Sequence, residues 1–172
     1  MGGDPANQVS SILRDTGRAC RAARLVRTGR QPDTLMPAPQ VLTRRVRRFL
    51  AKPRLAHLST VSPNGYPHVV PIYFMRQGDH ILFGTDQGEV KVRNALRHPR
   101  AAVVIGGDPD VDVEGYMILG ILTVEPDLGQ AMARRLLLRY ESDDETEDQL
   151  SQWSEGDTVL LRLKPRRIIR VW

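Results

Sequence analysis

The sequence predicts one mainly β domain, an antiparallel barrel or sandwich with helices attached. Three observations favour this class: about six short runs have strand character, few runs have helical character, and strands and helices do not alternate regularly. A length of 172 residues suits one domain with an appendage. The hydrophobic fraction of 41% and the charged fraction of 26% are ordinary for a globular protein.

The composition excludes several classes of protein. No apolar run reaches the roughly 20 residues needed to span a bilayer, so we expect no membrane partner. Cys20 is the one cysteine, which excludes a disulfide framework and disfavours a cysteine-ligated metal site. Aromatic residues make up 5% of the chain, so a nucleic-acid partner is not expected. Without a secretory signal, and with one thiol, we expect a cytoplasmic protein.

The positive charge is concentrated in the first part of the chain. Residues 1–52 hold 11 Lys and Arg against 3 Asp and Glu, whereas the remainder holds 14 against 17. We therefore expect residues 1–40 to form a basic, flexible N-terminal arm and residues 41–172 to form the domain. The arm's spaced arginines could contact nucleic acid or another anionic surface, but a solvated tail is the simpler interpretation. A native start at Met36 is a further alternative.

The first half of the domain predicts a helix followed by three strands. Apolar residues recur at helical spacing over 41–52, and the helix ends before a proline. Runs rich in β-branched and aromatic residues predict strands over 55–62, 67–75 and 80–85, joined by glycine-containing turns into an antiparallel meander. Within the second strand, Pro67 and Pro71 cannot donate ladder hydrogen bonds. That strand therefore needs an edge position, a bulge or a facing ligand there.

The second half predicts alternating helices and long strands. Asp86 and Glu89 stand three residues apart, a variant capping box that predicts a helix ending near Arg97. Strands are then expected over 100–105 and 115–125, the latter with a kink at Gly120.

The C-terminal third predicts a helix, a loop and a closing strand. The helix is expected over 126–140, after Pro126 and Asp127. The acidic run over 141–148 is interpreted as a solvated loop, because it lacks the glycine and offsets of an EF-hand. Residues 158–172 predict one bent strand or two short ones, broken at Pro165.

The junction between the third strand and the following helix is the strongest candidate for a binding site. Gly84 would let a ligand approach the backbone, and Thr85 offers a hydroxyl at the strand end. A helix N-terminus favours an anion such as phosphate. Lys91 and Arg93 add positive charge within the first two turns, where the helix dipole does not favour it. A capped surface helix with exposed cations explains the same pattern.

The order of these segments resembles a known family. The stretches HLSTVSPNGYPHVVPIYFM and HILFGTDQGEVKVRNALRHPRAAVVI are similar to the flavin-binding split barrels related to pyridoxamine 5′-phosphate oxidase. The likeness is greatest to their actinobacterial branch of flavin- and deazaflavin-dependent oxidoreductases, and it covers about residues 41–172. It implies a six-stranded antiparallel split β-barrel, a homodimer with cofactor sites at its interface, and a small-molecule redox substrate.

The resemblance also implies a set of cofactor-binding residues. The cofactor's phosphate would lie near Gly84, Thr85, Lys91 and Arg93. Its ring would lie along the second strand, against the residues that the family's pattern matches there: His68, Val69, Val70 and Pro71. The family's usual basic pair is incomplete, because Val90 precedes Lys91. No catalytic residue and no metal ligand is assigned.

The cofactor and the activity remain open between three alternatives. We favour hydride transfer between the deazaflavin coenzyme F-420 and a small organic substrate, in part because the arginines at 44, 45, 47 and 48 could meet an anionic cofactor tail. An FMN-dependent oxidoreductase is the second alternative. A non-catalytic flavin or haem carrier is the third, with an axial ligand from one of the four histidines, His57, His68, His80 and His98.

Overall fold

The computed structural model describes residues 42–107, 112, 114–153 and 155–171, so the expected arm over 1–40 and Cys20 lie outside the described residues. The strands are β1 (Ala56–Val61), β2 (Pro67–Ile72), β3 (Met75–Gln77), β4 (His80–Asp86), β5 (Arg100–Gly106), β6 (Gly115–Pro126) and β7 (Thr158–Arg170). The α-helices are α1 (Arg44–Leu50), α2 (Val90–Arg97), α3 (Ala131–Leu137) and α4 (Asp143–Ser151). Two short 3-10 helices also occur in the described chain: η3 (Leu128–Gln130) lies directly before α3, and η4 (Glu155–Asp157) directly before β7.

All described strands form one antiparallel sheet in the order β2-β1-β5-β6-β7-β4-β3. The mainly β fold is confirmed, with seven strands in the described chain where the sequence predicted six. The predicted three-stranded meander is wrong. β2 pairs with β1 and β3 pairs with β4, so β2 and β3, which follow one another in the chain, are the two edge strands of the sheet.

The predicted strand over 67–75 divides at Tyr73 and Phe74 for a physical reason. The Tyr140 hydroxyl lies 2.8 Å from the carbonyl oxygen of Phe74, to which it donates, and 3.3 Å from the Phe74 nitrogen. It therefore replaces the ladder partners that Phe74 lacks between the two strands. The Tyr73 ring stacks on that of Tyr140 with centroids 4.1 Å apart. Burial raises the pKa of Tyr140, which keeps this hydroxyl protonated.

The long β6–β7 pair carries the predicted kink at Gly120. The register shifts between Leu119 and Gly120, and Gly120 pairs with Pro165. A Cβ at Gly120 would lie 2.5 Å from the carbonyl oxygen of Lys164, so only glycine lets the two strands approach here. β7 is one continuous bent strand, which decides between the two alternatives left open by the sequence.

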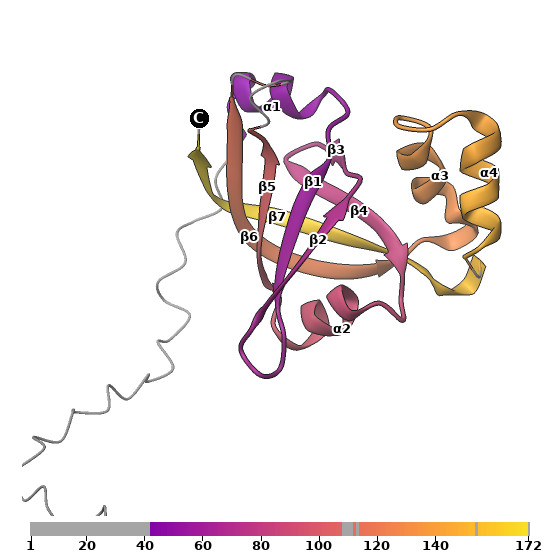
Figure 1. Ribbon diagram of the computed structural model, residues 1–172. Coiled ribbons are helices and arrows are strands. Elements are labelled where there is room, and N and C mark those ends of the chain that lie inside the picture. Colours follow the sequence, from indigo (N-terminus) through magenta and orange to yellow (C-terminus); the bar gives the residue numbers. More distant parts are fainter. Residues whose placement is uncertain (1–41, 108–111, 113, 154, 172) are drawn as a thin grey trace, which may run out of the picture. The chain divides into compact units, whose positions relative to one another are not determined.

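The main core fills the inside of the curved sheet and is covered at one end by α1 and beneath by α2 (Figure 1). α1 begins at the N-cap Thr43, whose hydroxyl accepts from the nitrogen of Val46. Its apolar stripe buries Val46, Phe49 and Leu50 against the sheet, as the spacing predicted.

The predicted capping box at Asp86 and Glu89 does not form. Asp86 is the last residue of β4, and its carboxylate accepts from the nitrogen of Gly88 at 2.7 Å. The helix begins at Val90, with Glu89 as an N-cap that makes no side-chain cap hydrogen bond. A three-residue turn therefore separates strand and helix, because the Asp86 side chain folds onto its own turn instead of reaching a helix N–H.

The helical hairpin of α3 and α4 corrects two further predictions. The predicted helix over 126–140 is shortened, because Gln130 takes a left-handed φ of 54° before α3 begins. The predicted loop over 141–148 is instead the beginning of α4, where Ser142 and Glu145 form a reciprocal capping box. Asp127, 4% exposed, anchors the hairpin by accepting from the nitrogens of Met132 and Ala133.

Candidate functional site

A cavity of about 200 Å³ opens where β4 ends. β4 and the beginning of α2 form one wall, and the α3–α4 hairpin forms the other. The apolar lining comes from the end of β2 and from the hairpin: Ile72, Tyr73, Ala133, Leu136, Leu137 and Trp153. The polar lining gathers around the strand–helix junction: Thr85, Asp86, Glu89, Lys91 and Gln149. We call this cavity the β4 pocket.

Three of the residues predicted for the cofactor site line the β4 pocket: Gly84, Thr85 and Lys91. Thr85 is 4% exposed and pairs with Val159 of β7, so its position is fixed by the sheet. Gly84 faces the hairpin, because a Cβ there would lie 3.5 Å from that of Ala133. The space that the missing side chain provides is therefore partly taken by α3.

Lys91 is the cation of the β4 pocket. Its side chain is 12% exposed, and its Nζ lies 3.4 Å from a carboxylate oxygen of Glu89. That separation is longer than a good charge-assisted hydrogen bond. A lysine whose side chain is mostly buried, and whose ammonium has one distant partner among the described residues, can accommodate a further anionic group.

Two carboxylates line the β4 pocket together with this cation. The Asp86 carboxylate already accepts from the Gly88 nitrogen, so it belongs to the turn. The Glu89 side chain is about half exposed and can move away from Lys91. Arg93 does not line the β4 pocket. Its guanidinium donates to the Gly88 carbonyl and is exposed, so it holds the turn that precedes α2.

The four residues predicted along the second strand lie on β2, which is an edge strand paired with β1 alone. Val69 and Pro71 point outward and are exposed, whereas His68 and Val70 are half-buried on the other face. An edge position explains how Pro67 and Pro71 are tolerated. Within the described part of the chain, the His68 Nδ1 atom is buried without a hydrogen-bond partner. None of these four side chains lines the β4 pocket, which β2 reaches at Ile72.

Sequence reasoning missed the wall that the helical hairpin contributes. A helix was predicted over 126–140, but nothing in the sequence placed it opposite Gly84. Gln149 and Trp153 were missed because the acidic run was interpreted as a loop. The spacing Ser142-x-x-Glu145 is a capping-box signal that would have identified α4.

The histidines do not gather at one place. His57 is exposed on β1, His80 begins β4, and His98 follows α2. Among the described residues, no group of three or more His, Cys, Asp or Glu side chains is arranged to hold a metal ion. In that same part of the chain, no helix combines the length and apolar character required to cross a bilayer.

Several solved structures share this fold at low sequence identity. An F420 reductase is 24% identical with a TM-score of 0.59, covering 71% of this chain and 94% of its own. A conserved hypothetical protein from Mycobacterium tuberculosis is 20% identical with a TM-score of 0.59, covering 80% and 89%. A pyridoxamine 5′-phosphate oxidase-related, FMN-binding protein from Nostoc punctiforme is 21% identical with a TM-score of 0.50, covering 68% and 73%.

The sequence itself identifies the family. No curated protein matches the chain. Residues 42–172, which include every described strand and helix, match the profile described as pyridoxamine 5′-phosphate oxidase. The chain therefore belongs to the pyridoxamine 5′-phosphate oxidase family, with the split-barrel fold of that family.

Proposed function

We propose that the protein is a cytoplasmic oxidoreductase that transfers hydride between coenzyme F-420 and a small organic substrate. The observation that carries the proposal is Lys91, whose side chain is 12% exposed in the β4 pocket and whose ammonium lies 3.4 Å from a carboxylate oxygen of Glu89. A phosphate or other anionic group of the cofactor is the ligand that such a buried cation accommodates. The F420 reductase of the same fold supports the choice of a deazaflavin.

The residues around the β4 pocket fit the anionic end of such a cofactor. Lys91 provides the charge, the Thr85 hydroxyl a hydrogen bond, and the first turn of α2 a favourable dipole that no side chain caps. Glu89 opposes the fit until its exposed side chain moves aside. In this proposal Arg93 acts indirectly, by holding the Gly88 carbonyl and so the shape of the turn.

The ring of the cofactor requires space beyond the β4 pocket. A cavity of about 200 Å³ is smaller than the roughly 300–1,000 Å³ usual for cofactor sites. The ring would therefore lie outside it, along the edge strand β2 from His68 to Pro71. Because Val69 and Pro71 are exposed there, a second copy of the chain is needed to exclude water. We therefore propose a homodimer whose second subunit completes each site.

The outer face of the sheet supports the proposed dimer. Apolar side chains on this face are exposed or half-exposed on β1, β2, β5 and β6: Val61, Val69, Ala102, Val104, Met117 and Leu119. The polar His57 and Ser59 of β1 lie between the residues of β2 and β5. The apolar part of this face favours contact with a second copy of the chain.

In this proposal the bound cofactor supplies the hydride chemistry, and the chain binds and orients it. Lys91 and Thr85 fix the anionic end, β2 fixes the plane of the ring, and the hairpin side chains Leu136 and Trp153 keep water from the pocket. Two alternatives are retained for the test. FMN is favoured by the FMN-binding protein of the same fold, and a haem carrier by the unpartnered His68 Nδ1 atom.

The test is a titration of the purified full chain with F-420 and with FMN, followed by visible absorbance and cofactor fluorescence. We expect F-420 to bind more tightly than FMN. Lys91→Ala should weaken F-420 binding at least about tenfold while the melting temperature stays nearly constant, because one charge-assisted contact is lost. Arg97→Ala, an exposed cation at the other end of α2, is the matched control.

Each result has a defined meaning. Tight binding of FMN with none of F-420 would replace the deazaflavin by the flavin alternative. A Soret band on adding haem, with no response to either cofactor, would replace the enzyme by a carrier. Binding of both cofactors that Lys91→Ala leaves unchanged would contradict the β4 pocket as the anionic subsite.

A further inference from the structure

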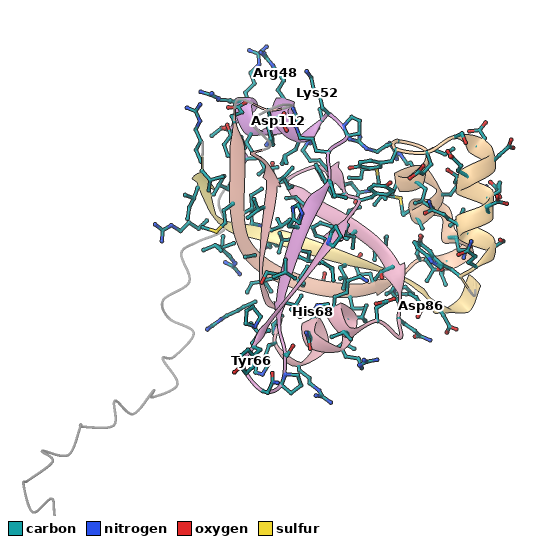
Figure 2. The ribbon with its side chains drawn as sticks, viewed as in Figure 1. Arg48, Lys52, Tyr66, His68, Asp86 and Asp112 are labelled. Atoms are coloured by element: carbon teal, nitrogen blue, oxygen red, sulfur yellow. The ribbon has the colours of Figure 1, made fainter. Side chains whose placement is uncertain are left out.

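A second, larger pocket lies beside α1, at the end of the barrel away from α2 and the β4 pocket. It measures about 530 Å³ and shares no lining residue with the β4 pocket. Figure 2 shows Arg48 and Lys52 at this end of the molecule, far from Asp86. Its lining includes five cations: Arg44, Arg45, Arg48, Lys52 and Arg54. We call it the α1 pocket.

Three of these cations form one stripe. Arg44 and Arg48 stand four residues apart on α1, so the helical turn brings them to the same side, and Lys52, just beyond the end of the helix, lines the same pocket. Among the described residues, no side chain pairs with any of the three. Like charges at this spacing repel one another, and Arg44 lies at the positive end of the helix dipole with no acidic residue in the first turn. Arg48, in the last turn, is favoured by the dipole, so the charge that the dipole disfavours is that of Arg44; the mutual repulsion of the three cations favours an anion between them.

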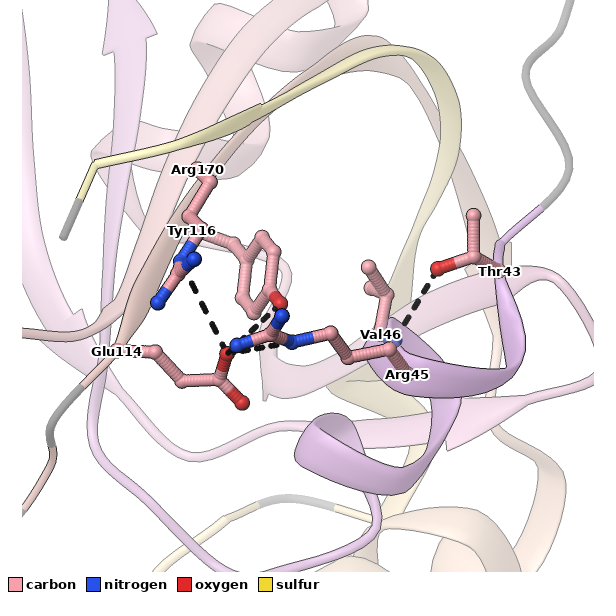
Figure 3. Close-up of polar contacts among 6 residues, drawn as sticks. All are labelled: Thr43, Arg45, Val46, Glu114, Tyr116 and Arg170. Carbon is pink, nitrogen blue, oxygen red and sulfur yellow. Dashed lines mark hydrogen bonds and ion pairs between the residues drawn. The ribbon is translucent and has the colours of Figure 1, made fainter.

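The other two cations are fixed in place by carboxylates. Arg54 donates from Nε to both oxygens of Asp112, at 2.8 and 2.9 Å, and from Nη1 to the carbonyl of Phe49. Arg45 pairs with Glu114 at 2.6 Å (Figure 3). These two arginines are neutralised and held, so they form rigid walls. The excess charge of the pocket is that of the stripe.

Glu114 is itself held from three sides, which keeps its carboxylate in the wall. The Tyr116 hydroxyl donates to its Oε2 atom at 3.1 Å, and the Nε atom of Arg170 lies 4.0 Å from the same oxygen (Figure 3). Burial acts to raise the pKa of Glu114, but the contacts with Arg45 and Tyr116 outweigh it and lower the pKa. Glu114 therefore remains ionised and keeps Arg45 occupied at neutral pH.

The α1 pocket has charge but no flat aromatic face. The Phe49 ring is 5% exposed, with the Arg54 guanidinium 4.1 Å above its centre and the Tyr116 ring against it at 5.0 Å. Among the described residues that line the pocket, Phe49 is the one aromatic side chain, and its ring is covered. The volume is within the range of small-molecule sites, and arginine forks match phosphate oxygens.

We propose that the α1 pocket binds a small oligophosphate, an anion with about three negative charges on consecutive phosphate groups. The three stripe cations are matched by such a chain, and the absence of a stacking surface leaves recognition to charge. A nucleic acid fits less well, because carboxylates flank the stripe: Asp112 and Glu114 on one side, and Asp79, which pairs with Arg47. The proposal does not depend on the proposed redox function.

The test is a calorimetric titration of the full chain with inorganic tripolyphosphate at fixed ionic strength. The double variant Arg48→Ala with Lys52→Ala should bind at least about tenfold more weakly, because two charge-assisted contacts are lost. The matched control is Arg97→Ala with Arg135→Ala, which removes the same charge from exposed positions on α2 and α3. It should retain affinity within about twofold. Titration with ATP should give nearly the same affinity as tripolyphosphate.

Four results would overturn the proposal. The first is no binding of tripolyphosphate to the unaltered chain. The second is an equal loss in both double variants, which would assign binding to net charge. The third is unchanged binding in the Arg48 and Lys52 variant, which would assign it to other residues. The fourth is a DNA fragment that binds and that tripolyphosphate does not displace. FMN binding should be unchanged in the Arg48 and Lys52 variant, which separates this test from that of the β4 pocket.

Discussion

The two pockets of this molecule are lined by different kinds of side chain. The β4 pocket is lined by buried apolar side chains such as Leu136 and Leu137, each 2% exposed, around one mostly buried cation. The α1 pocket is lined by exposed cations over a floor that ion pairs hold in place. The apolar wall of the β4 pocket is also part of the hydrophobic core, whereas the cations that line the α1 pocket are not.

This difference separates stability from binding in the two places. A change to the apolar wall of the β4 pocket removes packing that the hairpin requires, so it reduces stability and binding together. A change to the stripe of the α1 pocket alters charge where water already solvates the side chains, so it alters binding alone. Three substitutions test this contrast, in order of decreasing effect.

Leu136→Ala should produce the largest loss. Leu136 packs with Met75 and Leu82 between α3 and the sheet, and its truncation leaves a cavity next to an existing one. We expect the free energy of unfolding to fall by about 2–5 kcal/mol, measured by urea denaturation. Arg48→Ala at the α1 pocket should change it by less than about 0.5 kcal/mol. Similar losses in the two variants would remove the contrast.

Tyr140→Phe should produce an intermediate loss. The change keeps the ring stacked on Tyr73 but removes the hydroxyl that serves the backbone of Phe74. Leaving these groups without a partner should cost about 1–3 kcal/mol in the free energy of unfolding. Tyr66→Phe is the control, because Tyr66 is 72% exposed on a turn. Equal stability of the Tyr140 variant and the unaltered chain would show that water replaces the hydroxyl at no cost.

Glu114→Gln should produce the smallest loss, and one that depends on pH. The pKa of Glu114 is lowered below its ordinary value near 4.5, so its ionised form stabilises the fold above that pH. This contribution is lost as the pH falls through the lowered pKa. The melting temperature of the variant should therefore lie slightly below that of the unaltered chain at neutral pH. The two should converge in acid as the pH falls below the lowered pKa, and a constant difference from neutral pH into acid would contradict the assignment.

Much of the sheet was predictable because the residue types within each strand are enough to indicate a strand. Runs of strand-forming residues located β1 and β5 to within one residue of their observed ends. A glycine within a strand run indicated the kink at Gly120, where the structure leaves no room for a side chain beside Lys164. The β4 pocket was predictable at Thr85 and Lys91, because a glycine, a hydroxyl and a cation follow one another at a strand end.

What could not be predicted depends on contacts distant in sequence. The break at Phe74 is stabilised by Tyr140, 66 residues away, so a local pattern continues the strand through it. The separation of β2 from β3 follows from the same break. The part of the wall formed by Trp153 depends on α4. The acidic composition of α4 is typical of a loop, although its capping box is typical of a helix. The floor of the α1 pocket required the pairing of Arg54 with Asp112.

The position of β7 between β4 and β6 has a consequence for how the chain is made. During synthesis, β4 can pair only with the short β3 until Thr158–Arg170 have been translated. The C-terminal part of β6, beyond its pairing with β5, also has no partner until then. The sheet is therefore completed late, when the last strand, β7, pairs with both β6 and β4. Until that moment two unpaired strand edges are exposed to other nascent chains, so a pause in translation before Thr158 would favour aggregation.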